Sequence, residues 1–188
     1  MNRRFLVSFP NLAINREDVK KGMNRPGVVT ACRCVNVGLF LSHDLRRDVE
    51  VLLLIGPKED LRVIAFPGDT LKRVAPDERS VSFFLLKAHK ILQQLQPDSS
   101  ETMDNGMIVS RTTLDELCES NNPKAVFLSR DTTASHVIGE KIEQYADYIY
   151  EIEEGYFGSF NHSSRIIFRS PNPERLILDM NMQCDQMK

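Results

Sequence analysis

The stretch ACRCVNVGLFLSHDLRRDVEVLLLI, residues 31–55, decides how the rest of the chain is interpreted. It joins two apolar runs through the polar segment SHDLRRD, residues 42–48. The first run predicts a helix over residues 28–43 that is apolar on nearly every side, with Arg33 and Asn36 as its polar exceptions. The second run, residues 49–55, lacks the alternation of a half-exposed strand and predicts a central strand covered on both faces.

The polar joint carries two neighbouring arginines, Arg46 and Arg47. A joint of this kind, fixed between two buried elements, is suited to holding a phosphate or a structured nucleic acid through charge-assisted hydrogen bonds. The alternative is that the pair supplies favourable cations to the carboxyl end of the preceding helix. The residues alone leave both interpretations open.

Length and composition are those of one globular domain, residues 1–188, with a core of ordinary size. The formal net charge of −2 excludes a strongly basic nucleic-acid coat but permits a local basic patch. The start, MNRRFLVSFPN, does not read as a signal peptide, and no apolar run reaches about 18 residues, so no membrane span is expected. The cysteines at 32, 34, 118 and 184 are scattered, which indicates reduced, structural thiols in a cytoplasmic protein.

Strand and helix patterns alternate along the chain. Short apolar runs predict strands at 4–9, 49–55, 62–66, 107–109, 125–129, 148–152 and 165–168. Helical spacing predicts helices at 28–43, 77–95 and 113–120, a helix face from Ala134 to Tyr145, and a last helix capped by Asn172. The alternation predicts an α/β fold with a mostly parallel sheet. Residues 96–106 are expected to form a polar loop.

Open sheets of this class bind ligands at the carboxyl ends of their strands. The positions to examine first therefore follow Ile55, Ser129 and Ile152. The segment 153–164 after the last of these is long, aromatic and glycine-bearing, as functional loops often are, although it could be a plain crossover.

Several common catalytic motifs are absent from the sequence. No G-x-G-x-x-G opens a helix, and neither a phosphate-binding G-x-x-x-x-G-K-[ST] nor a hydrolase G-x-S-x-G occurs. The histidines at 43, 89, 136 and 162 lack ligand spacing, so no metal site is expected. Asp77 and Glu78 could act as a general base pair, or they could be first-turn acids that complement the helix dipole.

Four segments carry a family resemblance: CRCVNVGLFLSHDLRRDVEV at 32–51, LLLIGP at 52–57, VAPDERS at 74–80 and GMIVSRTTLDEL at 106–117. Over about residues 28–120 the chain resembles the TrmY family, the tRNA pseudouridine-N1-methyltransferases of the SPOUT superfamily. The resemblance implies an α/β SPOUT fold with a C-terminal trefoil knot, a homodimer, and S-adenosyl-L-methionine (SAM) bound in the knot. The implied reaction is methylation of N1 of pseudouridine at tRNA position 54.

The C-terminal third departs from the family pattern. AVFLSRDTTAS at 125–135 resembles the family's leucine-ended strand, with Leu128 in the leucine place. Ile152-Glu153-Glu154-Gly155 stands where a Leu-Gly-Pro turn is usual, and Phe160-Asn161-His162-Ser163 stands near the family's Ser-His-Cys. The resemblance implies five cofactor-binding residues, which are Leu128, Ile152, Gly155, Gly158 and Ser163.

On this basis we expect Arg46, Arg47 and Arg79 to bind the RNA backbone. Asp77 is expected to act as the base that accepts the N1 proton, or to orient the pseudouridine ring. The alternative is a catalytically degenerate SPOUT homologue that serves as an RNA-binding or structural dimer. A homodimer is expected because the 28–43 helix has few polar positions and because the last helix carries Leu178 and Met182 off its inward face. Arg33 and Asn36 are then expected near the subunit boundary.

Overall fold

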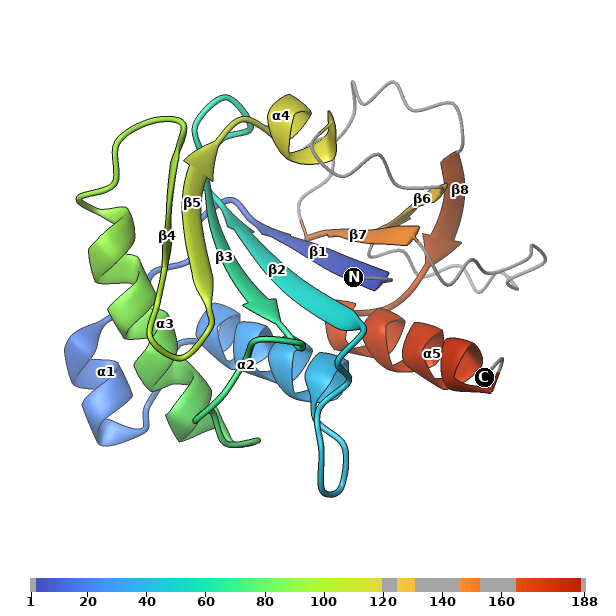
Figure 1. Cartoon of the computed structure of the whole chain (residues 1–188), viewed down its shortest axis with the longest axis horizontal. Coiled ribbons are helices and arrows are strands. Elements are labelled where there is room, and N and C mark those ends of the chain that lie inside the picture. The colour runs from blue at the N-terminus through green and yellow to red at the C-terminus, as the bar shows by residue number, and fades with distance from the viewer. Residues whose placement is uncertain (1–2, 120–124, 131–145, 153–164, 187–188) are drawn as a thin grey trace.

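The computed structural model describes residues 3–119, 125–130, 146–152 and 165–186, which form a mixed α/β fold around one sheet (Figure 1). The order of the eight described strands is β4-β5-β3-β2-β1-β7-β6-β8. Their bounds are β1 Arg3–Phe9, β2 Val49–Ile55, β3 Leu61–Pro67, β4 Ser99–Thr102, β5 Ile108–Thr112, β6 Ala125–Arg130, β7 Ala146–Glu151 and β8 Arg165–Arg169. Neighbours from β2 through β1, β7 and β6 to β8 are parallel, whereas β3, β5 and β4 add antiparallel strands at one side.

Strands β1 and β2 lie at the centre of the sheet, as was expected for β2 from its apolar pattern. β1 pairs with β2 on one side and with β7 on the other, and every residue of β1 is buried. In β2 only Glu50 is partly exposed, which confirms a strand covered on both faces. The buried pair Arg4–Asp147 joins β1 to β7 on one face, with Arg4 Nε donating to Asp147 Oδ1 at 2.8 Å.

The main core lies between the sheet and the helices on one of its faces. These helices are α1 Arg16–Lys21, α2 Pro26–Leu39, α3 Glu78–Leu92 and α5 Pro173–Asp185. Figure 1 shows α2 and α5 side by side against the sheet, with α3 and then α1 beyond α2. A smaller core on the opposite face includes Leu6, Leu54, Leu128 and Ile149, together with Leu114 from α4, Leu114–Glu119.

The helix expected at 28–43 begins two residues earlier and ends four residues earlier than its apolar pattern suggests. Phe40 is already extended, with φ −85° and ψ 135°, and it forms an isolated bridge with Leu45. The Arg46 N–H donates to the Leu39 carbonyl at 2.7 Å, and the Leu41 N–H donates to the Asp44 carbonyl at 2.9 Å. These contacts satisfy the backbone groups that another helical turn would have used, so residues 40–45 form a tight hairpin-like loop.

Two elements were missed by the sequence patterns. β4, Ser99–Thr102, lies inside the segment expected to be a polar loop, because an exposed, polar edge strand shows no apolar alternation. α1 is one short helix with a single buried residue, Val19. Its caps were nevertheless readable, since Asn15 accepts from the Glu17 N–H and Gly22 adopts the left-handed φ of 66°.

The remaining expected elements in the described part of the chain are present with shifted ends. α3 ends at Leu92 rather than at residue 95, and β5 and β7 each begin or end within three residues of the expected positions. The last helix is capped as predicted, because Asn172 Oδ1 accepts from the Arg175 N–H at 2.9 Å. The helix face from Ala134 to Tyr145, the loop 153–164 and the expected knot lie outside the described residues.

Cys32, Cys34 and Cys184 are free and buried, as the scattered cysteines indicated. Within the described ranges, no helix has both the length and the apolarity needed to cross a membrane. The same ranges contain no cluster of three or more His, Cys, Asp or Glu side chains placed to hold a metal ion.

Candidate functional site

The carboxyl ends of the parallel strands meet at one edge of the sheet. The strand order reverses at β1, which has β2 on one side and β7 on the other. In doubly wound sheets this switch point opens the crevice that receives ligands. A pocket of about 350 Å³ lies there, and we call it the strand-end pocket. Its described lining is Phe9, Pro10, Asn11, Pro26, Gly27, Thr30, Tyr150, Ile152, Pro171, Asn172, Pro173 and Glu174.

Three kinds of element shape the strand-end pocket. The turn after β1 and the end of β7 form one side, and the first turns of α2 and α5 form the other. Because helix N-termini present unsatisfied N–H groups and a partial positive charge, the pocket offers sites for anionic groups. Glu174 adds a carboxylate, 3.7 Å from Arg33, so a cationic group can be accommodated as well.

Hydrogen bonds fix the backbone path beside the pocket. The Ser8 hydroxyl donates to the Tyr150 carbonyl at 3.3 Å and accepts from the Ile152 N–H at 3.2 Å. The Tyr150 hydroxyl donates to the Ser170 carbonyl at 3.2 Å. One buried serine in β1 therefore holds the end of β7 in place. The sequence patterns missed this role, although a lone hydroxyl within the apolar run FLVSF, residues 5–9, was the available signal.

The expected cofactor residues divide among three places. Ile152 is 37% exposed and lines the strand-end pocket. Leu128 is buried in the smaller core, on the opposite face of the sheet from the pocket helices. Gly155, Gly158 and Ser163 lie outside the described residues. Ser129 follows Leu128 and pairs in register with Tyr150, so it faces the pocket side; its buried hydroxyl has no hydrogen-bond partner among the described residues.

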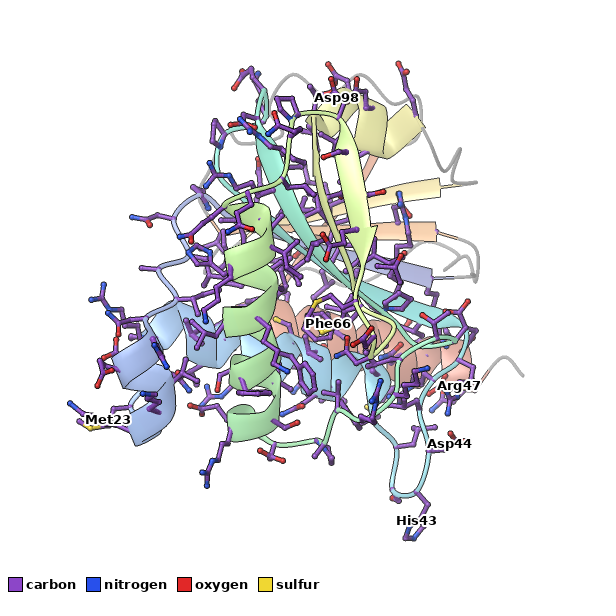
Figure 2. All side chains as sticks on the ribbon, turned by 60° about the vertical axis from the view of Figure 1, so that its left-hand side comes forward. Met23, His43, Asp44, Arg47, Phe66 and Asp98 are labelled. Carbon is purple, nitrogen blue, oxygen red and sulfur yellow. The ribbon has the colours of Figure 1, made fainter. Side chains whose placement is uncertain are left out.

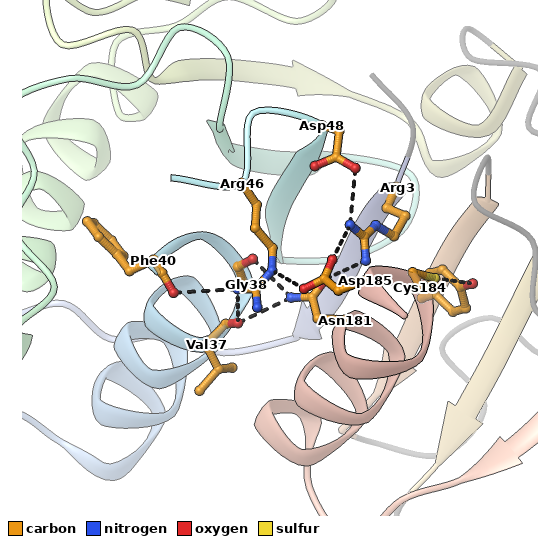
Figure 3. A network of polar contacts seen from close by, with 10 residues as sticks. Arg3, Val37, Gly38, Phe40, Arg46, Asp48, Asn181, Cys184 and Asp185 are labelled. Atoms are coloured by element: carbon orange, nitrogen blue, oxygen red, sulfur yellow. Dashed lines mark hydrogen bonds and ion pairs between the residues drawn. The ribbon is translucent and has the colours of Figure 1, made fainter. Parts of the chain in front are cut away.

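Arg46 and Arg47, adjacent in sequence, differ in their surroundings. The Arg46 side chain is only 12% exposed; its Nε donates to Asp185 at 3.0 Å, and its Nη1 donates to the carbonyls of Val37 and Phe40 at 3.4 Å (Figure 3). These are carbonyls at the end of α2, so the geometry matches the alternative in which an arginine serves a helix C-terminus.

Arg47 is directed outward. Its side chain is 54% exposed, donates to the Gly68 carbonyl at 3.1 Å, and lies 3.5 Å from Asp44. Figure 2 shows it at the base of the loop whose tip carries His43. Of the two arginines, Arg47 is therefore the one accessible to a phosphate, while Arg46 is held inside the fold.

Arg46 belongs to a polar network that ties the first strand to the last helix (Figure 3). Arg3, 1% exposed, donates through Nη2 to Asp48 and Asp185, each at 3.1 Å, and through Nη1 to Asn181 at 3.1 Å. Partial burial alone would raise the pKa of Asp185, but the hydrogen bonds from Arg3 and Arg46 outweigh it and hold that pKa below its usual value. This network is structural, because its charges satisfy one another.

Asp77 and Glu78 stand at the start of α3. Asp77 is the N-cap, one residue before the first turn, and its Oδ1 accepts from the Ser80 N–H at 2.8 Å. Glu78 accepts from Asn24 Nδ2 at 2.8 Å. Arg79 is exposed and borders a groove between α1 and α3. The described contacts of Asp77 are those of a helix cap, and its carboxylate remains open to solvent.

A mostly parallel sheet with helices packed on it and a pocket at its switch point defines the class of ligand-binding α/β domains. The chain belongs to the family described as "Putative SAM-dependent RNA methyltransferase", which matches residues 18–142.

Three similar proteins, each named tRNA (pseudouridine(54)-N(1))-methyltransferase, come from archaea. The Methanococcus maripaludis protein is 44% identical over 92 residues, 48% of this chain and 42% of that protein. The Haloferax volcanii protein is 36% identical over 104 residues, 53% of this chain and 50% of that protein. The Methanocorpusculum labreanum protein is 33% identical over 120 residues, 61% of this chain and 58% of that protein. In these alignments the chain spans about half the length of the relatives it matches.

Proposed function

We propose that the chain is a SAM-dependent RNA methyltransferase of the cytoplasm that methylates N1 of pseudouridine in tRNA, at position 54 as in the names of its relatives. The observation that carries the proposal is the family match over residues 18–142. The strand-end pocket supports it, because it provides a ligand crevice at the switch point of the sheet.

The residues around this crevice fit SAM, which carries a carboxylate, an ammonium and a sulfonium. The first turns of α2 and α5 suit the carboxylate, and Glu174 suits a cation. The buried Ser129 hydroxyl, in register with Tyr150 of the pocket lining, has no hydrogen-bond partner among the described residues, and a bound ligand would supply one. When bound, the cofactor supplies an electrophilic methyl group. We propose Ile152, Gly155, Gly158 and Ser163 as further cofactor-binding residues, with the backbone after β7 held by Ser8. Leu128, whose side chain is buried on the opposite face of the sheet, is proposed to contribute only through its main chain.

The chain's own part in the chemistry is to position the base and accept a proton. N1 of pseudouridine must lose its proton as the methyl arrives, and Asp77 is the proposed acceptor because its carboxylate is exposed beside Arg79. Arg47 and Arg79 are proposed to hold RNA phosphates. Arg46, which the sequence also suggested as an RNA-binding residue, would act mainly by supporting the loop that carries Arg47.

We propose a homodimer and a SPOUT fold with a C-terminal knot, on the basis of the same family membership. The apolar character of α2 does not by itself require a partner subunit, because half of its fourteen residues are buried by the chain's own elements. What remains is the outer face of α5, where Leu178 is 37% and Met182 is 53% exposed. Arg33, exposed on α2, and Asn36 would lie near this boundary. Light scattering at micromolar protein should give about twice the 21.5 kDa chain mass, and a stable monomer would contradict the interface.

The deciding experiment is methyl transfer from labelled SAM to a tRNA transcript that contains pseudouridine. Incorporation at N1, identified by mass spectrometry of nucleosides, would support the enzyme. The second candidate, a degenerate homologue that binds RNA without catalysis, is motivated by the Ile152-Glu153-Glu154-Gly155 departure. Calorimetry with S-adenosylhomocysteine separates the two: micromolar binding favours the enzyme, and no binding at millimolar ligand favours the degenerate homologue.

A further inference from the structure

We infer that the groove between α1 and α3 binds an unpaired segment of the RNA substrate, a role that rests on the proposed function. Figures 1 and 2 show α1 lying alongside α3. The hollow between them measures about 610 Å³. Its described lining is Arg16, Val19, Lys20, Asp77, Arg79, Ser80, Phe83, Leu86, Lys87 and Lys90.

The rim of this groove is strongly cationic. Five of its side chains are cations, namely Arg16, Lys20, Arg79, Lys87 and Lys90, whereas its one acid is Asp77. In the part of the chain that the structure describes, none of the five forms an ion pair. Since the whole chain has a net charge of −2, this concentration of unpaired positive charge is a local feature. Such a patch attracts a polyanion and releases its counterions on binding.

The floor of the groove is apolar and includes an exposed aromatic ring. Val19 is buried and Leu86 is partly buried, but Phe83 is 47% exposed. Its ring lies 5.4 Å from that of Phe84 in an edge-on arrangement, and Lys87 Nζ lies 4.5 Å from its centroid. Neighbours on the same helix thus hold the phenyl ring in place while leaving it accessible. An aromatic ring beside cations is the combination that proteins use to stack bases and grip phosphates of single-stranded nucleic acid.

The cationic rim continues beyond the first groove. A second hollow of about 500 Å³ lies against the same lysines, Lys87 and Lys90, and is also lined by Phe84, Ile91 and Arg73. The lysines therefore border both hollows. Figure 2 shows Arg47 at the right of the view and α1 at the left. The groove and the surface around Arg47 could therefore contact separate parts of one folded RNA.

The test compares three variants with the full-length wild type. Lys87→Gln with Lys90→Gln removes two cations, Phe83→Leu removes the ring but keeps an apolar side chain, and Lys58→Gln, in the β2–β3 turn, is the matched control. Fluorescence anisotropy over a salt series would follow a tRNA transcript and an unstructured oligoribonucleotide. Thermal melting and binding of S-adenosylhomocysteine would confirm that each variant is folded.

For the oligoribonucleotide we plot the logarithm of the binding constant against the logarithm of the salt concentration. We expect the double lysine variant to reduce the magnitude of this slope by about 1.4, at ~0.7 per lost phosphate contact. Phe83→Leu should weaken its binding roughly 5- to 140-fold without changing that slope. The control should bind like the wild type.

Wild-type affinity in both groove variants, with RNA binding by the wild type intact, would overturn the groove while leaving the proposed function standing. A wild type that binds S-adenosylhomocysteine but no RNA would instead overturn the proposed function itself. Competition by polyglutamate as effective as competition by RNA would show that the groove takes an acidic protein segment and would overturn the RNA assignment.

Discussion

Replacing Arg46 and Arg47 one at a time by glutamine should separate two effects that a double substitution would mix. Arg46 Nε makes a 3.0 Å charge-assisted hydrogen bond to Asp185, a kind of bond that contributes about 1.5–3 kcal/mol when it is well shielded. Asp185 is 35% exposed and keeps its contact with Arg3, so water replaces part of what is lost. The two bonds at 3.4 Å to the carbonyls at the end of α2 are long and contribute little.

Arg46→Gln should therefore lower the free energy of unfolding by about 1–2 kcal/mol. For a chain of this size that corresponds to a melting temperature lower by roughly 2–8 °C. Arg47→Gln should change stability by less than about 0.5 kcal/mol, because its side chain is more than half exposed. It should instead weaken tRNA binding and reduce the magnitude of the salt slope by about 1.

The assay is urea unfolding at fixed protein concentration, combined with a salt series of tRNA binding on the same preparations. An Arg46→Gln variant that unfolds like the wild type and loses RNA affinity would refute the structural role of Arg46. Destabilisation by Arg47→Gln in place of Arg46→Gln would also contradict the structure. Arg46 would then not be the arginine that stabilises the fold.

Four further substitutions test three individual carboxylates. If Asp77 is the base, Asp77→Asn should abolish methyl transfer without lowering the melting temperature, because asparagine still caps α3. Asp77→Ala should lower stability by about 1 kcal/mol whether or not Asp77 is the base. Full activity in Asp77→Asn would leave capping as the only role of Asp77. Burial, more than its neighbours Asp69 and Asp147, raises the pKa of Glu50, so its ionised form opposes folding. Glu50→Gln should then unfold at higher urea than the wild type at pH 7, with the difference vanishing below about pH 4.3; equal midpoints at pH 7 would contradict this. The pKa of Asp185 is lowered in the folded state, so its ionised form favours folding. Its contribution to stability is present above about pH 3.9 and is lost as the pH falls through its pKa in the folded protein. Asp185→Asn should accordingly be less stable than the wild type at pH 7 and should match it in acid, as followed by circular dichroism.

The sequence predicted best the elements whose burial is one-sided or complete. β1 and β2 were recognisable because every position or nearly every position is covered, and α5 because its cap and its inward face both follow from local spacing. β4 and α1 were missed because each buries too little to leave an apolar pattern. The end of α2 was misplaced because the chain remains apolar through Phe40 and Leu41 after the helical hydrogen bonds have stopped.

The site was predictable only where its chemistry is local. Asp77 stands at the start of an amphipathic helix, and a structural role there follows from that position, although the sequence placed Asp77 in the first turn and the structure places it at the N-cap. Arg46 and Arg47 could not be told apart, because the partner that distinguishes them, Asp185, is 139 positions away in the chain. The cationic groove was missed for the same reason, since its two rims come from separate helices that are brought together only by the fold.

The central place of β1 has a consequence for synthesis of the chain on the ribosome. Strands β1 to β5 are contiguous in sequence and can pair with one another as soon as they emerge, but β1 then forms the outer edge of that half-sheet. Its second neighbour, β7, is distant, since 143 positions separate Arg4 from Asp147. At cellular translation speeds of about 5–20 residues per second, this edge waits roughly 7–30 s for its partner. Throughout that interval the nascent chain presents a seven-residue strand with the apolar run FLV and unpaired backbone groups at its outer edge. Such an edge is a hazard for association with other chains and a natural point for chaperone protection.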